Sequence, residues 1–184
     1  MLGAITGDIV GSVYERHNIK TKEFEFFSTR HPCRPTDDSI MTLAVANAIL
    51  NAENCNLSLE KEAVKQMQML GAMYPRAGYG GNFRYWLRNP NPQPYNSYGN
   101  GAAMRVSPCG FAASSLEDAI RLADAVTKVT HNHPEGMKEL RQPLQPFIWP
   151  ESEKPSRRSG ISSIRTSTGS LSHSMKSALP IPLT

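Results

Sequence analysis

The sequence predicts an all-α fold for residues 1–138, followed by a tail of different composition. Three stretches of this first part carry apolar residues at helical spacing behind a capping residue, and residues 139–184 carry no such pattern. The 184 residues fit one domain comfortably, with 39% hydrophobic and 20% charged residues as in ordinary globular proteins. No apolar run approaches the ~18 residues of a membrane-spanning helix, so we expect no membrane insertion.

The first strong helix signal follows Thr36, a residue type favoured at the N-cap. Asp37 and Asp38 come next, in the first turn, where the helix dipole favours acidic side chains. The apolar residues behind them form one stripe with few helix breakers: Ile40, Met41, Leu43, Ala44, Ala46, Ala48, Ile49 and Leu50. We therefore predict a helix that begins after Thr36.

A second helix is predicted from Ser58 to about Met73, because Pro75 then stops it. Its inward-facing residues are Ala63, Met67 and Leu70. Between this helix and the next, the Gly- and Asn-rich stretch 78–101 leaves room only for a short aromatic helix around Phe83–Leu87.

The third predicted helix begins at Ser115, with Asp118 as its capping-box partner. Its apolar residues are Ala119, Ile120, Leu122, Ala123 and Val126. Residues 139–184 hold ten serines and six prolines, a composition that predicts a disordered tail.

The positive charge belongs mainly to this tail. Residues 139–184 carry six Lys or Arg and three Glu, which accounts for most of the net charge of +4. A nucleic-acid-binding domain needs a basic face with aromatic residues on a folded domain, and none is visible, so we expect no specific nucleic-acid binding.

The cysteines and the N-terminus favour a cytoplasmic protein. Cys33, Cys55 and Cys109 are too few and too scattered for a disulfide framework, and none has zinc-finger spacing. The N-terminal stretch MLGAITGDIV lacks a basic segment and contains Asp8, which makes it a poor secretion signal.

The sequence Thr36-Asp37-Asp38-Ser39 offers several hard oxygen ligands within one helical turn. Such a set suits Mg²⁺ or Mn²⁺. The alternative is ordinary capping, since acidic residues are common in the first turn of a helix.

The N-terminal stretch GDIVGSVYE contains both small and acidic residues. Gly7 and Gly11, four apart on a helix, would let another backbone approach closely, and Asp8 and Glu15, seven apart, would share one helical face. The alternative is a small-residue packing seam with two solvated acidic side chains.

A glycine-rich region follows, in two parts: Gly78 to Gly81, and Ser97 to Arg105. Backbone N–H groups that lead into a helix form a cradle for phosphate, and the tyrosines could stack on a base or ribose. The spacing matches neither the dinucleotide fingerprint nor the P-loop, and a plain loop is the alternative.

The last candidate is the pair of histidines in Thr130-His131-Asn132-His133. Two such side chains could bind a metal, but no third ligand type lies nearby, which favours a surface or core role. The sequence has no G-x-S-x-G motif, so nucleophilic catalysis receives little support.

Taken in order, GDIVGSVYE, PTDDS, GYGG, SYGNGAAMR and THNHPEG closely resemble the ADP-ribosylglycohydrolase family over residues 1–138. The resemblance implies an all-α domain that cleaves the glycosidic bond between ADP-ribose and a side chain or small molecule, usually with two Mg²⁺ ions. ADP-ribose or an ADP-ribosylated substrate is then the expected partner.

Position by position, the resemblance assigns metal ligation to Thr36, Asp37 and Asp38, and implies catalytic roles for Asp37, Asp38 and Glu15. Ser39 stands where Thr is common. The resemblance implies that His131 lies close to the ligand. The residues matching the diphosphate and ribose loops are Gly78, Tyr79, Gly80, Gly81, Ser97, Tyr98, Gly99, Asn100, Gly101 and Met104.

The family's second metal cluster, a GGDxDT-like motif, has no counterpart here, and no Asp follows Asp124. We interpret residues 139–184 as a frameshift product. With permitted codons, reading from the third nucleotide of the Lys138 codon turns ELRQPLQPFIWPESEKPSRRSGI into GATATAAAIYLARIGKTKQEIRD, an Ala-rich amphipathic helix. The alternative is a genuine variable tail.

This interpretation divides the chain into residues 1–138, the N-terminal part of a truncated domain, and a non-family tail. Hydrolysis is then expected to be impaired, and the apolar faces at 40–50 and 116–126 to lack partners, with marginal folding as the result. The alternatives for function are a non-catalytic ADP-ribose-binding remnant and an unrelated helical interaction protein with a basic tail.

Overall fold

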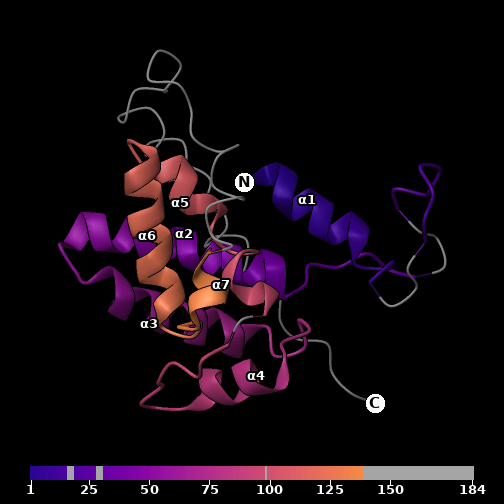
Figure 1. The fold of residues 1–184 in the computed structure, drawn as a ribbon. Helices are drawn as coiled ribbons and strands as arrows, with labels where there is room; N and C mark the ends of the chain where they lie inside the picture. Colours follow the sequence, from indigo (N-terminus) through magenta and orange to yellow (C-terminus); the bar gives the residue numbers. More distant parts are fainter. Residues whose placement is uncertain (16–18, 28–30, 98, 139–184) are drawn as a thin grey trace, which may run out of the picture. The chain divides into compact units, whose positions relative to one another are not determined.

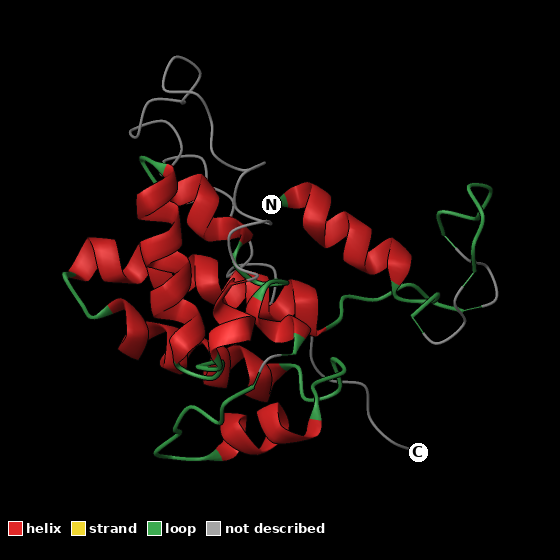
Figure 2. Ribbon diagram, viewed as in Figure 1, coloured by secondary structure: helices red, strands yellow, loops and turns green. Residues whose placement is uncertain are grey.

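The computed structural model describes residues 1–15, 19–27, 31–97 and 99–138. Every described residue belongs to one compact unit, Met1–Ile148. The described residues form helices and loops without any strand, which confirms the all-α prediction (Figure 2). The predicted tail, and with it the division after Lys138, concerns residues outside the described ones.

Helix α2 (Asp37–Cys55) contacts α1 (Leu2–Gly11), α3 (Leu59–Met73) and α5 (Ser107–Ala112) (Figure 1). Its predicted start is confirmed, because Thr36 is the N-cap and its hydroxyl accepts the N–H of Asp38 at 3.4 Å. The buried apolar side chains of α2 are Ile40, Met41, Ala44, Val45, Ala48 and Ile49.

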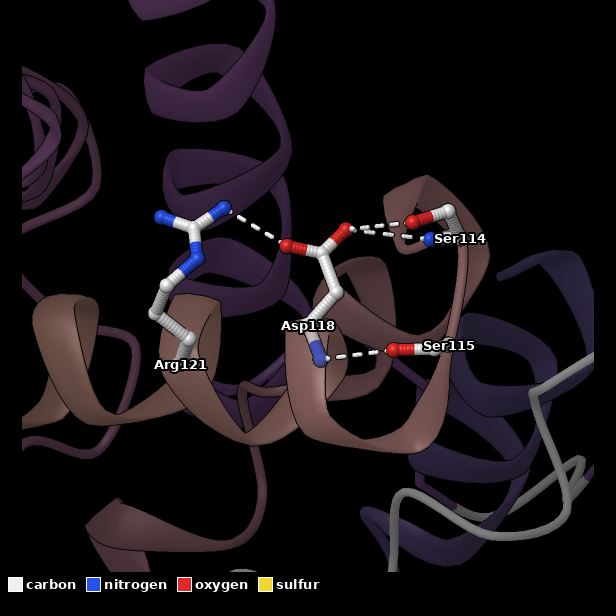
Figure 3. A network of polar contacts seen from close by, with 4 residues as sticks. All are labelled: Ser114, Ser115, Asp118 and Arg121. Atoms are coloured by element: carbon white, nitrogen blue, oxygen red, sulfur yellow. Dashed lines mark hydrogen bonds and ion pairs between the residues drawn. The ribbon is translucent and has the colours of Figure 1, made fainter.

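The other two predicted helices begin at their predicted caps. Ser58 caps α3, and Ser115 caps α6 (Leu116–Lys128) by accepting the N–H of Asp118 at 3.1 Å. The carboxylate of Asp118 reaches back to the N–H and hydroxyl of Ser114, one residue before the cap, and pairs with Arg121 at 2.6 Å (Figure 3). The capping box therefore forms, but the carboxylate of Asp118 accepts the backbone N–H of Ser114 instead of that of the N-cap Ser115.

The expectation that two apolar faces lack partners is wrong for the described residues. The α2 face packs against α3 and α5, and Ala119, Ala123 and Val126 of α6 are fully buried where α6 contacts α3 and α5. Small alanine side chains let α6 approach these helices closely, so residues 1–138 enclose a core of their own.

The glycine-rich region carries more regular structure than we predicted. Helix α4 (Gly81–Arg88) confirms the predicted aromatic helix, and its Phe83 and Trp86 rings stack with centroids 5.5 Å apart. A 3₁₀ turn, η1 (Asn100–Ala102), and α5 follow, and α7 (Pro134–Lys138) comes after α6. Helices this short show no apolar period, which is why the sequence pattern missed them.

Helix α1 ends before Glu15, so the prediction that Asp8 and Glu15 share one helical face is wrong. It stops at Gly11, where Ser12 Oγ bonds the carbonyl of Ile9 and the chain turns, so Glu15 does not share a helical face with Asp8. A Cβ on Gly7 or Gly11 would meet nothing within 4 Å. Among the described residues, therefore, no other segment packs closely against either glycine, and the predicted packing seam does not form.

No helix among the described residues has both the length and the apolar character needed to span a bilayer.

Candidate active site

Two adjoining hollows lie where α1, α2 and the glycine-rich loops come together. The larger, the main cleft, has a volume of about 650 Å³, within the range of small-molecule sites. The smaller, the α1–α2 hollow, has about 330 Å³. Glu15, Asp38 and Met104 line both, so these three residues form the boundary that the two hollows share.

The main cleft gathers most of the predicted site residues from five separate segments of the chain. The predicted residues that line it are Glu15, Asp37, Asp38, Gly80, Gly81, Ser97, Gly99, Asn100, Gly101, Met104 and His131. Three others, Thr36, Gly78 and Tyr79, do not line it, and Tyr98 lies outside the described residues.

The acidic part of the cleft is built at the start of α2. Asp8 of α1 accepts the N–H of Thr36 at 2.9 Å, the N–H of Ser39 at 3.2 Å and both hydroxyl groups. The Asp8 carboxylate thus satisfies backbone donors that a helix start leaves unpaired, at the end where the helix dipole favours negative charge. Sequence reasoning noted Asp8 but missed this role, which joins residues 28 and 31 positions apart.

Asp37 and Asp38 are half-buried carboxylates in a region of accumulated negative charge. Burial raises the pKa of Asp38 to about 6, and the charges of Asp37, Asp8 and Glu15 add to the increase. Burial also raises the pKa of Asp37. Burial and the negative neighbours both disfavour the ionised form of these carboxylates.

This donor set fits a hard divalent cation. Mg²⁺ is typically held by one or two carboxylates and completes its shell with water and ligand oxygens, and a cation here would offset the repulsion that raises the pKa of Asp38. Thr36 is buried, with its hydroxyl already bonded to Asp8. Across the described ranges, no three His, Cys, Asp or Glu side chains converge on one metal-binding position.

Gly78 and its neighbours hold the first glycine-rich loop beside the start of α2. The N–H of Asp37 donates to the carbonyl of Ala77 at 2.8 Å. Gly78 has a φ of +110°, which side-chain-bearing residues rarely adopt, and a Cβ there would lie 3.1 Å from Asp37 Oδ1. Position 78 therefore requires glycine because of its backbone conformation and its closeness to Asp37; Gly78 itself does not line the cleft.

The structure places Tyr79 in the core, which corrects the expectation that its ring could stack on a ligand. Its side chain is only 3% exposed, and its ring lies against Phe83 with centroids 5.8 Å apart. Burial, with a contribution from Asp37, raises the pKa of its hydroxyl to about 12. The residue packs beneath the loop that carries Gly80.

A buried cation also lines the main cleft. Arg105 is 1% exposed, donates from Nη2 to Thr130 Oγ1 at 2.6 Å and lies over the ring of Phe83, 5.8 Å from its centroid. Burial lowers the pKa of its guanidinium to about 10, so it stays charged at neutral pH. Sequence reasoning quoted Arg105 within a motif but gave it no role, because burial of a single Arg has no local signal.

His131 lies next to Arg105 and is 4% exposed. Its Nδ1 lies 2.7 Å from Thr130 Oγ1, and its ring is 5.9 Å from that of Tyr95, a cleft residue that we did not predict. Burial and the charge of Arg105 lower the pKa of His131 to about 4. The imidazole is therefore neutral at physiological pH.

The two histidines of the last motif do not act together. His133 Nδ1 accepts the N–H of Glu135 at 3.2 Å, at the start of α7, whereas His131 faces the cleft. A paired metal site is thus not what the structure forms from these side chains.

Comparisons with known proteins bear on this arrangement. A sequence model of the ADP-ribosylglycohydrolase family matches residues 1–139. The chain is similar to proteins named ADP-ribosylhydrolase ARH3 from Xenopus tropicalis, at 28% identity over 71% of this chain and 43% of the relative, and from Homo sapiens, at 29% identity over 71% and 43%. The chain therefore spans less than half the length of these relatives.

Proposed function

This chain belongs to the ADP-ribosylglycohydrolase family, and on that premise we propose that its main cleft binds ADP-ribose and contributes to hydrolysis of ADP-ribosyl glycosidic bonds. The observation that carries the proposal is the gathering of eleven predicted residues, from five segments, around one cleft of about 650 Å³. Such convergence is what a binding site requires and what chance placement of loop residues does not give.

The two parts of the cleft suit the two parts of this ligand. A diphosphate is attracted by the buried charge of Arg105 and by backbone N–H groups of the glycine-rich loops around Gly80 and Gly101. The acidic part, with Asp37 and Asp38, suits ribose hydroxyls, which donate hydrogen bonds to carboxylates. The relatives named ADP-ribosylhydrolase support the same ligand class.

We propose that Mg²⁺, with Mn²⁺ as a substitute, is held by Asp37 and Asp38. The hydroxyl of Thr36, which the resemblance also assigns to the metal, would join them only by giving up its hydrogen bond to Asp8. When bound, the ion would supply polarisation of ligand oxygens and would offset negative charge. Glu15, at the junction of the two hollows, is proposed to accept a proton from the attacking water or to stabilise positive charge at the anomeric carbon.

Isothermal titration calorimetry with ADP-ribose, on the full 184-residue chain, tests the binding proposal. We expect tighter binding with Mg²⁺ than with EDTA, and loss of that difference in Asp38→Asn. Asp124→Asn is the matched control, because Asp124 pairs with Lys128 on the surface of α6. Binding that is absent in wild type, or equally weakened by both substitutions, would contradict the proposal.

A second candidate function is ADP-ribose binding without turnover. It is favoured because, within the described ranges, no three His, Cys, Asp or Glu side chains are arranged so that they could together hold a metal ion. Release of ADP-ribose from ADP-ribosylated peptides, measured with Mg²⁺ and with Glu15→Gln as the comparison, separates the two. Release above that of the variant supports hydrolysis, and binding without release supports the non-catalytic function and the expected impairment.

A further inference from the structure

The Thr130 hydroxyl connects the buried Arg105 guanidinium to the ring of His131. Arg105 Nη2 donates to Thr130 Oγ1 at 2.6 Å, and Oγ1 lies 2.7 Å from His131 Nδ1. The three residues are almost completely buried, at 1%, 0% and 4% exposed. Short contacts in such an enclosed place fix the orientation of the ring and restrict where each proton lies.

The single proton of the Thr130 hydroxyl has two acceptors within reach. One is the carbonyl of Thr127, 3.2 Å from Oγ1. That carbonyl already accepts the backbone N–H groups of Thr130 at 3.0 Å and of His131 at 2.9 Å. Because a carbonyl oxygen has two lone pairs, these bonds use its capacity, and the nearer His131 Nδ1 is the better acceptor for the hydroxyl.

Arg105 reinforces this direction of donation. A guanidinium can only donate, so the Thr130 oxygen must accept from it, and accepting from a cation strengthens the hydroxyl as a donor to its next neighbour. Burial, and with it the same positive charge, disfavours a cation on the adjacent His131 ring, which keeps the imidazole neutral. A neutral ring that accepts at Nδ1 carries its proton on Nε2.

We propose that Arg105 and Thr130 are positioning residues that hold His131 as the Nε2–H tautomer, so that Nε2 donates a hydrogen bond to an oxygen of bound ADP-ribose. Nε2 lies 3.0 Å from where a Cβ on Gly101 would stand, and His131 and Gly101 both line the main cleft. The identity of the ligand rests on the proposed function, whereas the tautomer is a property of the ligand-free chain.

The tautomer is tested by long-range ¹H–¹⁵N correlation spectroscopy on the uniformly ¹⁵N-labelled full chain, with His131→Gln to assign the ring signals. We expect a pyridine-type Nδ1 and a pyrrole-type Nε2 at neutral pH. Thr130→Ser retains the hydroxyl and should retain this pattern, whereas Thr130→Val removes it and should give a mixed or reversed pattern. A pyrrole-type Nδ1 in wild type overturns the proposal.

Calorimetry with ADP-ribose measures the consequence for binding. Thr130→Val should weaken binding roughly three- to tenfold, the value of one hydrogen bond, and Thr130→Ser by less than about twofold. Equal weakening by both variants, at unchanged far-UV circular dichroism, overturns the positioning role. The expected tautomer without any wild-type binding refutes the proposed function and its ligand, whereas binding with the opposite tautomer refutes this inference alone.

Discussion

Asp8 is predicted to be the main link that fixes the start of α2, and its removal should destabilise the chain measurably. Asp8→Ala removes four hydrogen bonds, two from the backbone N–H groups of Thr36 and Ser39 and two from their hydroxyls. It also leaves donors at the first turn of α2 without a partner, and α2 carries much of the apolar core.

The magnitude follows from two opposing effects. Four hydrogen bonds to a half-buried carboxylate, at roughly 1 kcal/mol each, amount to about 4 kcal/mol. Against this, loss of the Asp8 charge relieves repulsion on Asp38, where that charge ranks third among the causes of the raised pKa. Because burial ranks first, the relief should stay below about 1 kcal/mol. The expected net loss is about 3–4 kcal/mol.

Urea unfolding of the full chain in EDTA, followed by circular dichroism, gives the free energy of unfolding. Asp8→Asn keeps one acceptor oxygen and should lose roughly 1 kcal/mol, between wild type and Asp8→Ala. Asp124→Ala is the matched control, since it removes a surface ion pair worth at most about 0.5 kcal/mol. If Asp8→Ala were no more destabilising than Asp124→Ala, the assigned role of Asp8 would be refuted.

Three further outcomes are expected. Gly78→Ala should lower the unfolding free energy by about 1–3 kcal/mol, because Gly78 has a φ of +110°. Gly81→Ala should leave it unchanged, because a Cβ at that position would meet nothing within 4 Å. Similar melting temperatures for the two variants would contradict this prediction. His131, whose pKa falls from 6.5 to about 4 on folding, binds fewer protons than in the unfolded chain between these values. The contribution of His131 to the unfolding free energy should therefore be greatest above about pH 6.5 and fall by up to roughly 3 kcal/mol toward pH 4. Asp38, with its pKa raised to about 6, acts in the opposite direction over this range, so the contribution of His131 is read as the difference between wild type and His131→Gln, and a difference that does not change with pH would disprove this cause. Cys109 is buried and its pKa is raised to about 12, so it should react with a thiol reagent only after unfolding, whereas the exposed Cys55 should react in the native chain. Labelling of Cys109 as early as Cys55, followed by mass spectrometry, would argue against the burial of Cys109.

The helix starts could be predicted from the sequence because they depend on neighbours in the chain. Thr36, Ser58 and Ser115 each accept a backbone N–H two or three residues ahead, so residue type and spacing contain the information. The same holds for the apolar stripe of α2. The short helix α5 has no such period and could not be found.

The candidate site was predictable as a set of residues, and the tertiary structure determined how they are used. Asp8 meets Thr36 across 28 positions, and Arg105 meets Thr130 across 25, distances over which no local pattern acts. Tyr79, one residue before Gly80, turns into the core instead of the cleft, because it packs on Phe83. Local rules fix which segments are helical, but burial and pairing depend on which segments pack together, and only the folded chain decides that.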